Sequence, residues 1–190
     1  MANGLRAGEA LPYQGLSAAG SSVRIMRWNE FRSMCPELAG IGQRRLEERH
    51  LCLIGTLRRD GWPRISPVEP YLVDGELMMG MMPGSRKAAD LLRDPRLVMH
   101  SIVTRWEADE GDVKLYGTAQ PVTEPEPRNA LFQAMTEAHG WSELPQLAQD
   151  PAYHVYCLAI DRAAYVRFDG SSWQDWTWDP QRGLSKRSHQ

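Results

Sequence analysis

Residues 51–82 read LCLIGTLRRDGWPRISPVEPYLVDGELMMGMM, and this stretch decides the fold because short apolar runs alternate in it with turn residues. The run at 51–57 predicts one strand, and the run at 63–73 predicts a second strand that is interrupted by Pro67 and Pro70. Because proline supplies no N–H group to a ladder, these two residues exclude an ordinary central strand.

The pair Asp74-Gly75 is the strongest hairpin signal in the chain. The residues YLV precede it and ELMMGMM follow it. Together with the strand at 51–57, this hairpin predicts three successive antiparallel strands. Such a meander is typical of all-β sheets and barrels.

The rest of the chain adds more strands than helices. Further strands are predicted at 96–103, 113–122, 153–160, 163–168 and 171–178, and helices at 28–49 with a break at Pro36, from the N-cap Ser85 to Asp94, and from 125 to Gly140. The strands and helices do not alternate as they do in a parallel doubly wound sheet. The sequence therefore predicts a mainly β fold with short helices, arranged as a closed or nearly closed antiparallel barrel of seven or eight strands.

The composition bounds the class of protein. Of the 190 residues, 42% are hydrophobic and 24% are charged, close to the averages of globular domains. We expect a single domain over residues 23–190, preceded by a flexible arm over 1–22 that is rich in Gly, Ala and Ser. The net charge is -2, with 22 basic and 24 acidic residues, so the overall charge gives no support to nucleic-acid binding.

The sequence also bounds the compartment. No apolar run approaches the roughly 20 residues that span a bilayer, and the N-terminus lacks a charged segment followed by an apolar one. We therefore expect no membrane partner and a cytoplasmic protein. The three cysteines, Cys35, Cys52 and Cys157, are far apart and form no C-x-x-C pair, which predicts buried free thiols rather than disulfides or zinc ligands.

Motifs of several enzyme classes are missing from the sequence. It contains no G-x-S-x-G, H-E-x-x-H, G-x-G-x-x-G or Walker A pattern, and no catalytic or metal-binding set can be named from it. The histidines are scattered without an i, i+4 pair, although His50, His100 and His154 are candidates to hold a haem iron.

The segment Ser85-Arg86-Lys87 places two cations at the start of a predicted helix, which carries partial positive charge. One explanation is that both side chains extend into water, at a cost of about 0.3 to 1 kcal/mol. The other is that the hydroxyl, the free N–H groups and the cations converge on a phosphate. Arg64 on the neighbouring strand would supply a third cation, which favours the phosphate explanation.

These features in this order, from about Trp28 to Val122, resemble the pyridoxamine 5'-phosphate oxidase-like, FMN-binding split β-barrel superfamily. The chain looks most similar to the bacterial branch of flavin- or deazaflavin-dependent oxidoreductases, and its TWDPQRGLSKR segment is similar to a Trp-x-Pro-x-x-Gly ending in that branch. The resemblance implies that Ser85, Arg86 and Lys87 bind the cofactor phosphate. It also implies that Arg64 lies near the phosphate or the ribityl chain.

The resemblance further implies a homodimer with the flavin between the subunits. Contacts from the second chain would then include aromatic residues, for which the cluster of Trp173, Trp176 and Trp178 is a candidate. The alternative is that these large aromatic side chains pack in the core or between subunits.

The chain departs from the oxidases that give the family its name. Where those carry Tyr-Thr-Asn before Ser-Arg-Lys, this chain has Gly80-Met81-Met82, and it lacks their C-terminal Arg-x-His pattern. The resemblance therefore does not predict oxidation of vitamin B6. Met81 and Met82 would instead form a soft apolar wall against a planar ring.

The leading hypothesis is an FMN-binding oxidoreductase that transfers a hydride to or from a small molecule that the sequence does not identify. One alternative is a deazaflavin-dependent oxidoreductase, for which Arg58, Arg59 and Arg93 would widen the basic groove unless they are simply solvated. The other alternative is a flavin- or haem-binding protein without turnover.

Overall fold

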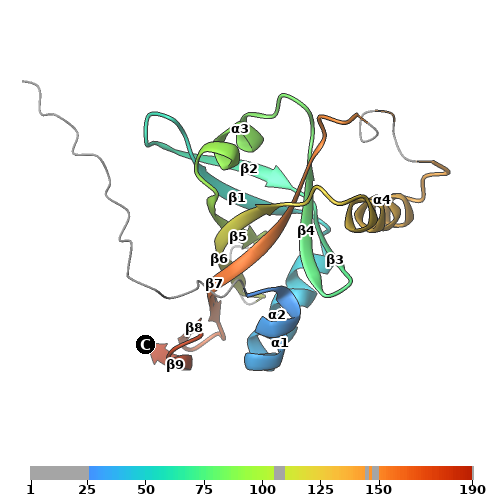
Figure 1. The fold of residues 1–190 in the computed structure, drawn as a ribbon. Helices are drawn as coiled ribbons and strands as arrows, with labels where there is room; N and C mark the ends of the chain where they lie inside the picture. The colour runs from blue at the N-terminus through green and yellow to red at the C-terminus, as the bar shows by residue number, and fades with distance from the viewer. Residues whose placement is uncertain (1–25, 105–109, 144–145, 147–149, 190) are drawn as a thin grey trace, which may run out of the picture.

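The structure is a computed structural model that describes residues 26–104, 110–143, 146 and 150–189 (Figure 1). The predicted arm over residues 1–22 lies outside the described residues. The strands are β1 (Cys52–Leu57), β2 (Pro63–Val68), β3 (Pro70–Val73), β4 (Glu76–Met81), β5 (Arg96–Ser101), β6 (Asp112–Pro121), β7 (His154–Phe168), β8 (Trp173–Asp179) and β9 (Gly183–His189). The helices are α1 (Trp28–Met34), α2 (Pro36–Glu47), α3 (Arg86–Arg93) and α4 (Pro125–His139).

The nine strands of the described residues form one antiparallel sheet, in which seven follow the order β2-β1-β5-β6-β7-β4-β3 while β8 and β9 lie off this path. The long strand β7 pairs with β6 on one side; on the other side its first part pairs with β4 and its last part with β8. Strand β9 pairs with β8 and completes a C-terminal hairpin. The predicted mainly β class with short helices and an antiparallel barrel is therefore confirmed.

The sheet curls without closing through hydrogen bonds, because β2 and β3 form its two ends. These two strands are consecutive in the chain, and Glu69 alone separates them. The chain itself thus joins the two edges of the barrel. We call this junction, Val68–Pro70, the seam.

The seam shows that two predictions are wrong: the single second strand over 63–73 and the three-strand meander. Strand β2 pairs with β1, whereas β3 pairs with β4 at the opposite end of the sheet. The physical reason is Pro70, which has no N–H group with which to continue the ladder of β2 and which holds the preceding residue in an extended conformation.

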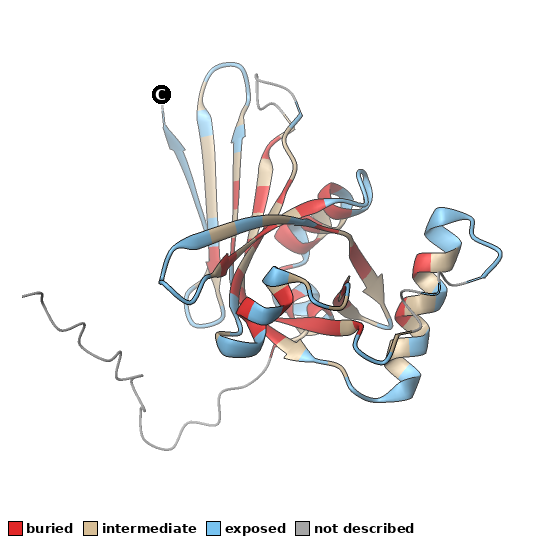
Figure 2. Ribbon diagram, turned by 90° about the horizontal axis from the view of Figure 1, so that it is seen from above, coloured by how far each residue is buried: buried red, intermediate tan, exposed pale blue. Residues whose placement is uncertain are grey.

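Buried residues alternate with less buried ones along the strands that enclose the core (Figure 2). In β1, for example, every second residue is buried, as expected for a strand with one face toward the interior. Large, fully buried side chains from the strands include Ile54, Leu77, Met79, Met99, Leu115 and Leu158, and those from α1 and α2 include Trp28, Phe31 and Leu38.

The helices cover different parts of the barrel. Helices α1 and α2 lie at one end and α3 at the other, while α4 lies beside β3 and β4 (Figure 1). The break predicted at Pro36 is confirmed, because α1 ends at Met34 and α2 begins at Pro36. Within the described ranges, none of the helices combines the length and the apolar character needed to cross a bilayer.

Two local predictions from the deciding stretch are confirmed. Asp74 and Gly75 join β3 to β4 with φ angles of 49° and 82°, the left-handed backbone that a two-residue hairpin turn requires. Ser85 is the N-cap of α3 and Asp94 is its C-cap.

The prediction of two separate strands at 153–160 and 163–168 is wrong, because these residues form one continuous strand, β7. Tyr116 lies opposite Arg162 and Gly117 lies opposite Ile160, so Asp161 has no partner in β6. Such a bulge lets a strand continue past an extra residue. The strand β9 was not predicted, since its residues are mostly exposed and show no apolar alternation.

Candidate functional site

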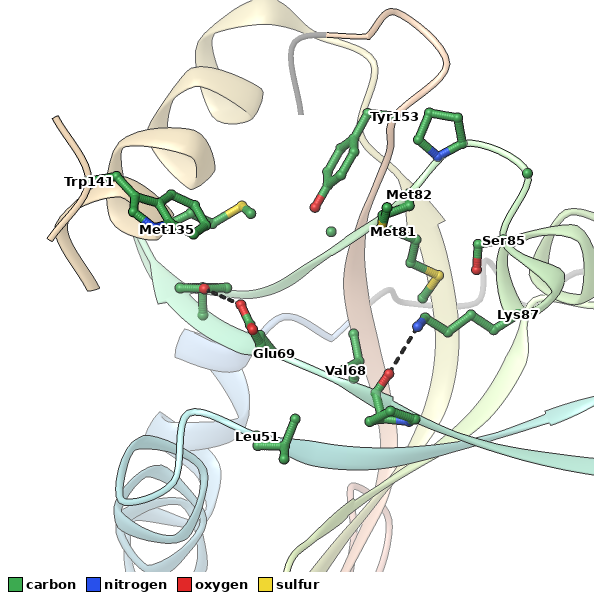
Figure 3. Close-up of a pocket in the computed structure, with 15 residues that line it drawn as sticks. Leu51, Val68, Glu69, Met81, Met82, Ser85, Lys87, Met135, Trp141 and Tyr153 are labelled. Carbon is green, nitrogen blue, oxygen red and sulfur yellow. Dashed lines mark hydrogen bonds between the residues drawn. The ribbon is translucent and has the colours of Figure 1, made fainter. Parts of the chain in front are cut away.

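A cavity of about 590 Å³ opens at the seam, between the ends of β2 and β4, the start of α3 and the end of α4 (Figure 3). We call it the seam cavity. This volume falls within the usual range of small-molecule and cofactor sites. Its lining consists of Leu51, Pro67, Val68, Glu69, Tyr71, Gly80, Met81, Met82, Pro83, Gly84, Ser85, Lys87, Met135, Trp141 and Tyr153.

One end of the seam cavity is suited to an anion. Ser85 and Lys87 line it, and the Nζ atom of Lys87 donates a hydrogen bond of 2.9 Å to the carbonyl oxygen of Pro67. Partial burial lowers the pKa of Lys87. Helix α3 has no acidic residue in its first turn, and no side chain caps its N-terminus. Its first N–H groups therefore have no capping side chain as a partner.

The middle of the cavity is apolar. Met81 is buried and Met82 is 54% exposed, and Figure 3 shows both between Tyr153 and Lys87. A Cβ atom at Gly80 would lie 2.2 Å from the hydroxyl oxygen of Tyr153. A side chain at position 80 would therefore displace Tyr153.

The other end of the cavity carries a polar cluster that the sequence did not predict, formed by Glu69, Tyr71 and His139. The hydroxyl of Tyr71 donates to Oε2 of Glu69 at 2.7 Å, and Nε2 of His139 lies 3.0 Å from the same oxygen. The ring of His139 stacks on Trp141, with centroids 4.2 Å apart and planes inclined by 14°. We call this group the Glu69 cluster.

Charge in the Glu69 cluster resides on the carboxylate. Partial burial by itself raises the pKa of Glu69, but the hydrogen bonds from Tyr71 and His139 outweigh it and lower the pKa below its ordinary value. Burial and the neighbouring carboxylate raise the pKa of Tyr71. At neutral pH the carboxylate is therefore ionised and the phenol is neutral.

The structure separates the cations that the sequence had grouped together. Arg64 does not line the seam cavity; its Nε atom donates to Oδ2 of Asp90 at 2.6 Å. Arg86 is exposed at the first turn of α3 and is also absent from the cavity lining. Of the predicted site residues, Met81, Ser85 and Lys87 share the cavity.

Arg64 belongs instead to a second cavity of about 420 Å³, which Arg58, Arg59, Asp60, Asp90 and Arg93 also line. Asp90 is buried and accepts hydrogen bonds from Thr56, Arg64 and Arg93. Although burial of Asp90 acts to raise its pKa, these donors lower it. The second cavity thus gathers the arginines considered for a larger cofactor.

The thiols and the three histidines considered for haem are not among the residues that line the seam cavity. Cys35, Cys52 and Cys157 are free and buried as predicted, and burial raises the pKa of Cys52 and Cys157 to about 12. None of the haem candidates His50, His100 and His154 lines the seam cavity. Among the described residues there is no group of three or more side chains that could hold a metal ion.

The three tryptophans of the C-terminal hairpin lie in different environments. Trp178 is buried and its ring centroid is 4.8 Å from that of Phe31. Trp176 packs against Tyr165 at 5.5 Å, with the ammonium of Lys186 4.0 Å from its ring centroid. Trp173 is 45% exposed. Core packing therefore accounts for Trp178, while Trp173 has surface to offer a partner.

The sequence matches a known protein family. The sequence profile of the family described as pyridoxamine 5'-phosphate oxidase matches residues 42–167. No curated protein matches the sequence.

Several solved structures share the fold. A Clostridium acetobutylicum protein of the pyridoxinephosphate oxidase family, related to general stress protein 26, has a TM-score of 0.57 and 16% identity over 74% of this chain and 92% of its own. An FMN-binding protein of Nostoc punctiforme has a TM-score of 0.59 and 13% identity over 82% and 95%. The haem storage protein HutZ of Vibrio cholerae has a TM-score of 0.56 and 18% identity over 65% and 90%. At these identities the similarity establishes the fold, a split barrel.

Proposed function

Because this chain belongs to the pyridoxamine 5'-phosphate oxidase family, we propose that it is an FMN-binding oxidoreductase that transfers a hydride to or from a small molecule. The observation that carries the proposal is that Ser85 and Lys87 line the same cavity as Met81. Groups that bind a phosphate and a wall that accepts a flat ring are thus present in one site.

The residues of the seam cavity fit an FMN phosphate at the start of α3. Lys87 has three N–H donors, of which Pro67 occupies one, so two remain for phosphate oxygens. The Ser85 hydroxyl and the first N–H groups of α3 add uncharged donors, and Arg86 adds a cation from the solvent side. A Cβ atom at Gly84 would meet no atom within 4 Å, so the backbone there is open to a ligand.

The chain contributes binding and orientation, while the flavin supplies the hydride chemistry when it is bound. Met81 and Met82 would hold one face of the ring and exclude water from it. The Glu69 cluster lies at the opposite end of the cavity from Lys87 (Figure 3). If the phosphate binds near Lys87, the end of the cavity near Glu69 is left for the substrate.

A row of residues on the outer face of the sheet supports the proposed homodimer. Ile65, Gly55, Val98 and Tyr116 lie directly opposite one another on β2, β1, β5 and β6. Ile65 is 72% exposed, and the three others are partly exposed. We call this the outer row. An exposed apolar row on a sheet favours burial against another surface.

Two alternatives rest on specific observations. The arginines of the second cavity favour a deazaflavin coenzyme with a longer acidic tail, since Arg58, Arg59, Arg64 and Arg93 surround one hollow. Binding of haem without turnover is favoured by the fold shared with the haem storage protein HutZ. An absorption spectrum of the purified protein separates the three cofactors by their bands, and a colourless protein that accepts none of them would contradict every version.

Binding of FMN by the double variant Arg86→Ala with Lys87→Ala tests the site. Charge-assisted hydrogen bonds contribute about 1.5–3 kcal/mol each, so we expect the affinity to fall more than tenfold in a calorimetric titration. The matched control is Lys186→Ala with Arg187→Ala, which removes an adjacent basic pair from β9, away from the cavity. Unchanged affinity in the first variant would mean that the cations at the helix start are merely solvated.

We further propose that the protein acts in the cytoplasm. The three buried thiols support this, because free cysteines persist in a reducing compartment. Fractionation of cells that express the full chain checks the assignment.

A further inference from the structure

The backbone fixes Glu69 at the seam. It is the single residue between β2 and β3, and it lies between Val68 and Pro70. Val68 is buried in the core and Pro70 begins the ladder with β4. Because both neighbours are held in place, the Glu69 side chain leaves the backbone at a defined point of the cavity wall, as labelled in Figure 3.

The hydrogen bonds of Glu69 involve one of its two carboxylate oxygens. Tyr71 and His139 both bond to Oε2. Within the described part of the chain, no hydrogen bond to Oε1 is present. The carboxylate side chain is 41% exposed. One oxygen is therefore used to orient the group, and the other is free to accept a hydrogen bond from a ligand.

The charges along the seam cavity have opposite signs at its two ends. Lys87 is at one end and Glu69 at the other (Figure 3). The titratable groups around Glu69 are Tyr71, His139 and, at longer range, Tyr153 and His50. Both phenols are neutral at pH 7 because their pKa values are raised, so the Glu69 carboxylate supplies the negative charge at this end.

The walls around the Glu69 cluster are mostly apolar and partly aromatic. Met135 and the indole of Trp141 lie on one side, Leu51 lies below in the view of Figure 3, and Tyr153 lies above. Aromatic and thioether side chains pack well against planar rings. The surroundings of Glu69 thus combine apolar and aromatic side chains, which suit a planar body, with a hydrogen-bond acceptor of negative charge.

We propose that Glu69, oriented by Tyr71 and His139, selects planar substrates that carry a protonated nitrogen. This inference rests on the proposed function, because it assigns the end of the cavity away from Lys87 to the substrate. A charge-assisted hydrogen bond from the nitrogen to Oε1 is the interaction that discriminates. An uncharged ring of the same shape gains the apolar contacts alone, and an anionic one is repelled.

The probes are 9-aminoacridine, a planar cation at pH 8, and acridine, the related ring system that is uncharged at that pH. We expect the full-length protein to bind the cation more than tenfold tighter than acridine in calorimetric titrations. Glu69→Gln keeps an oxygen that accepts from Tyr71 and is expected to abolish this preference while the affinity for acridine stays unchanged. The matched control is Glu37→Gln, which removes one negative charge from an exposed ion pair with Lys186 and is expected to keep the preference.

Two results would overturn the inference. One is a preference for 9-aminoacridine over acridine that survives in Glu69→Gln, and the other is a loss of this preference that is equal in Glu37→Gln. A parallel titration with FMN separates this outcome from failure of the proposed function. Protein that prefers the cation but does not bind FMN would contradict the proposed function and leave a site for a planar cation. Protein that binds FMN without discriminating the two acridines would contradict the inference alone.

Discussion

At the scale of single residues, Asp90 organises the end of the barrel that α3 covers. Its side chain is 5% exposed, and it pairs with Arg64 and Arg93, which are 24% and 38% exposed. The arrangement explains why Arg64 is absent from the lining of the seam cavity. A buried carboxylate requires partners of opposite charge, and Arg64 meets that need.

Replacing Asp90 with Ala is expected to lower the free energy of unfolding by about 3 kcal/mol, because removing one member of a buried ion pair leaves its partners, here Arg64 and Arg93, without a counter-charge. Urea denaturation at pH 7 measures the effect. The control Asp60→Ala removes a carboxylate that is 51% exposed and paired with Arg58, and exposed pairs contribute about 0–1 kcal/mol. A loss of stability that is equal in the two variants would contradict the role of Asp90.

Asp90 also accounts for part of the loss of stability that we expect at acid pH. The pKa of Asp90 is lowered in the folded protein from its ordinary value of 3.8, so the folded state binds this proton less readily than the unfolded chain. Its stabilising contribution is therefore fully present well above pH 4 and is lost as the pH falls through the folded pKa. Between pH 7 and pH 3, Asp90→Ala should lose less stability than the wild type in the same urea assay.

At the scale of the elements, local sequence signals predicted the turns and helix ends that depend on residues close together in the chain. The Asp74-Gly75 hairpin and the helix from Ser85 to Asp94 are both present, because turn and capping preferences act over a few residues. The bulge in β7 was misread as a turn, since the charged pair Asp161-Arg162 interrupts the apolar alternation as a turn would.

The candidate site was predicted in part for the same reason. Met81, Ser85 and Lys87 are close in sequence and share the cavity. The Glu69 cluster joins residues 70 positions apart, and no local pattern reports such a contact. The one available signal was a glutamate between Pro67 and Pro70, a charged residue at the point where a strand breaks.

The bulge gives a prediction about glycine. A Cβ atom at Gly117 would lie 1.8 Å from the backbone oxygen of Ala159, so Gly117→Ala forces the two strands apart. We expect a loss of about 1–3 kcal/mol of stability, as for other overpacked sites. Thermal denaturation of Gly40→Ala provides the contrast, because position 40 lies within α2 with room for a methyl group and alanine there should stabilise by about 0.5–1 kcal/mol.

At the scale of the whole molecule, the barrel presents its outer row to a partner. Ile65→Arg places a charge in the centre of the proposed contact, and we expect a dimer to become a monomer in light scattering coupled to size exclusion. Leu92→Arg is the matched control, since Leu92 is 64% exposed and Ile65 is 72% exposed, but Leu92 lies on α3, away from the row. A wild-type protein that is monomeric at high concentration would contradict the proposed dimer.

The prolines of β2 and β3, the two strands that the seam joins, have a consequence for how copies of the chain interact. A sheet that does not close exposes edges, and a flat edge is a template on which other chains add strands and aggregate. Here the two strands at the ends of the barrel contain proline, with Pro63 and Pro67 in β2 and Pro70 in β3, and proline offers no N–H group to an incoming strand. The prolines of β2 and β3, among them the one that divides the predicted strand, thereby also protect these two edges of the barrel from adding strands of other copies.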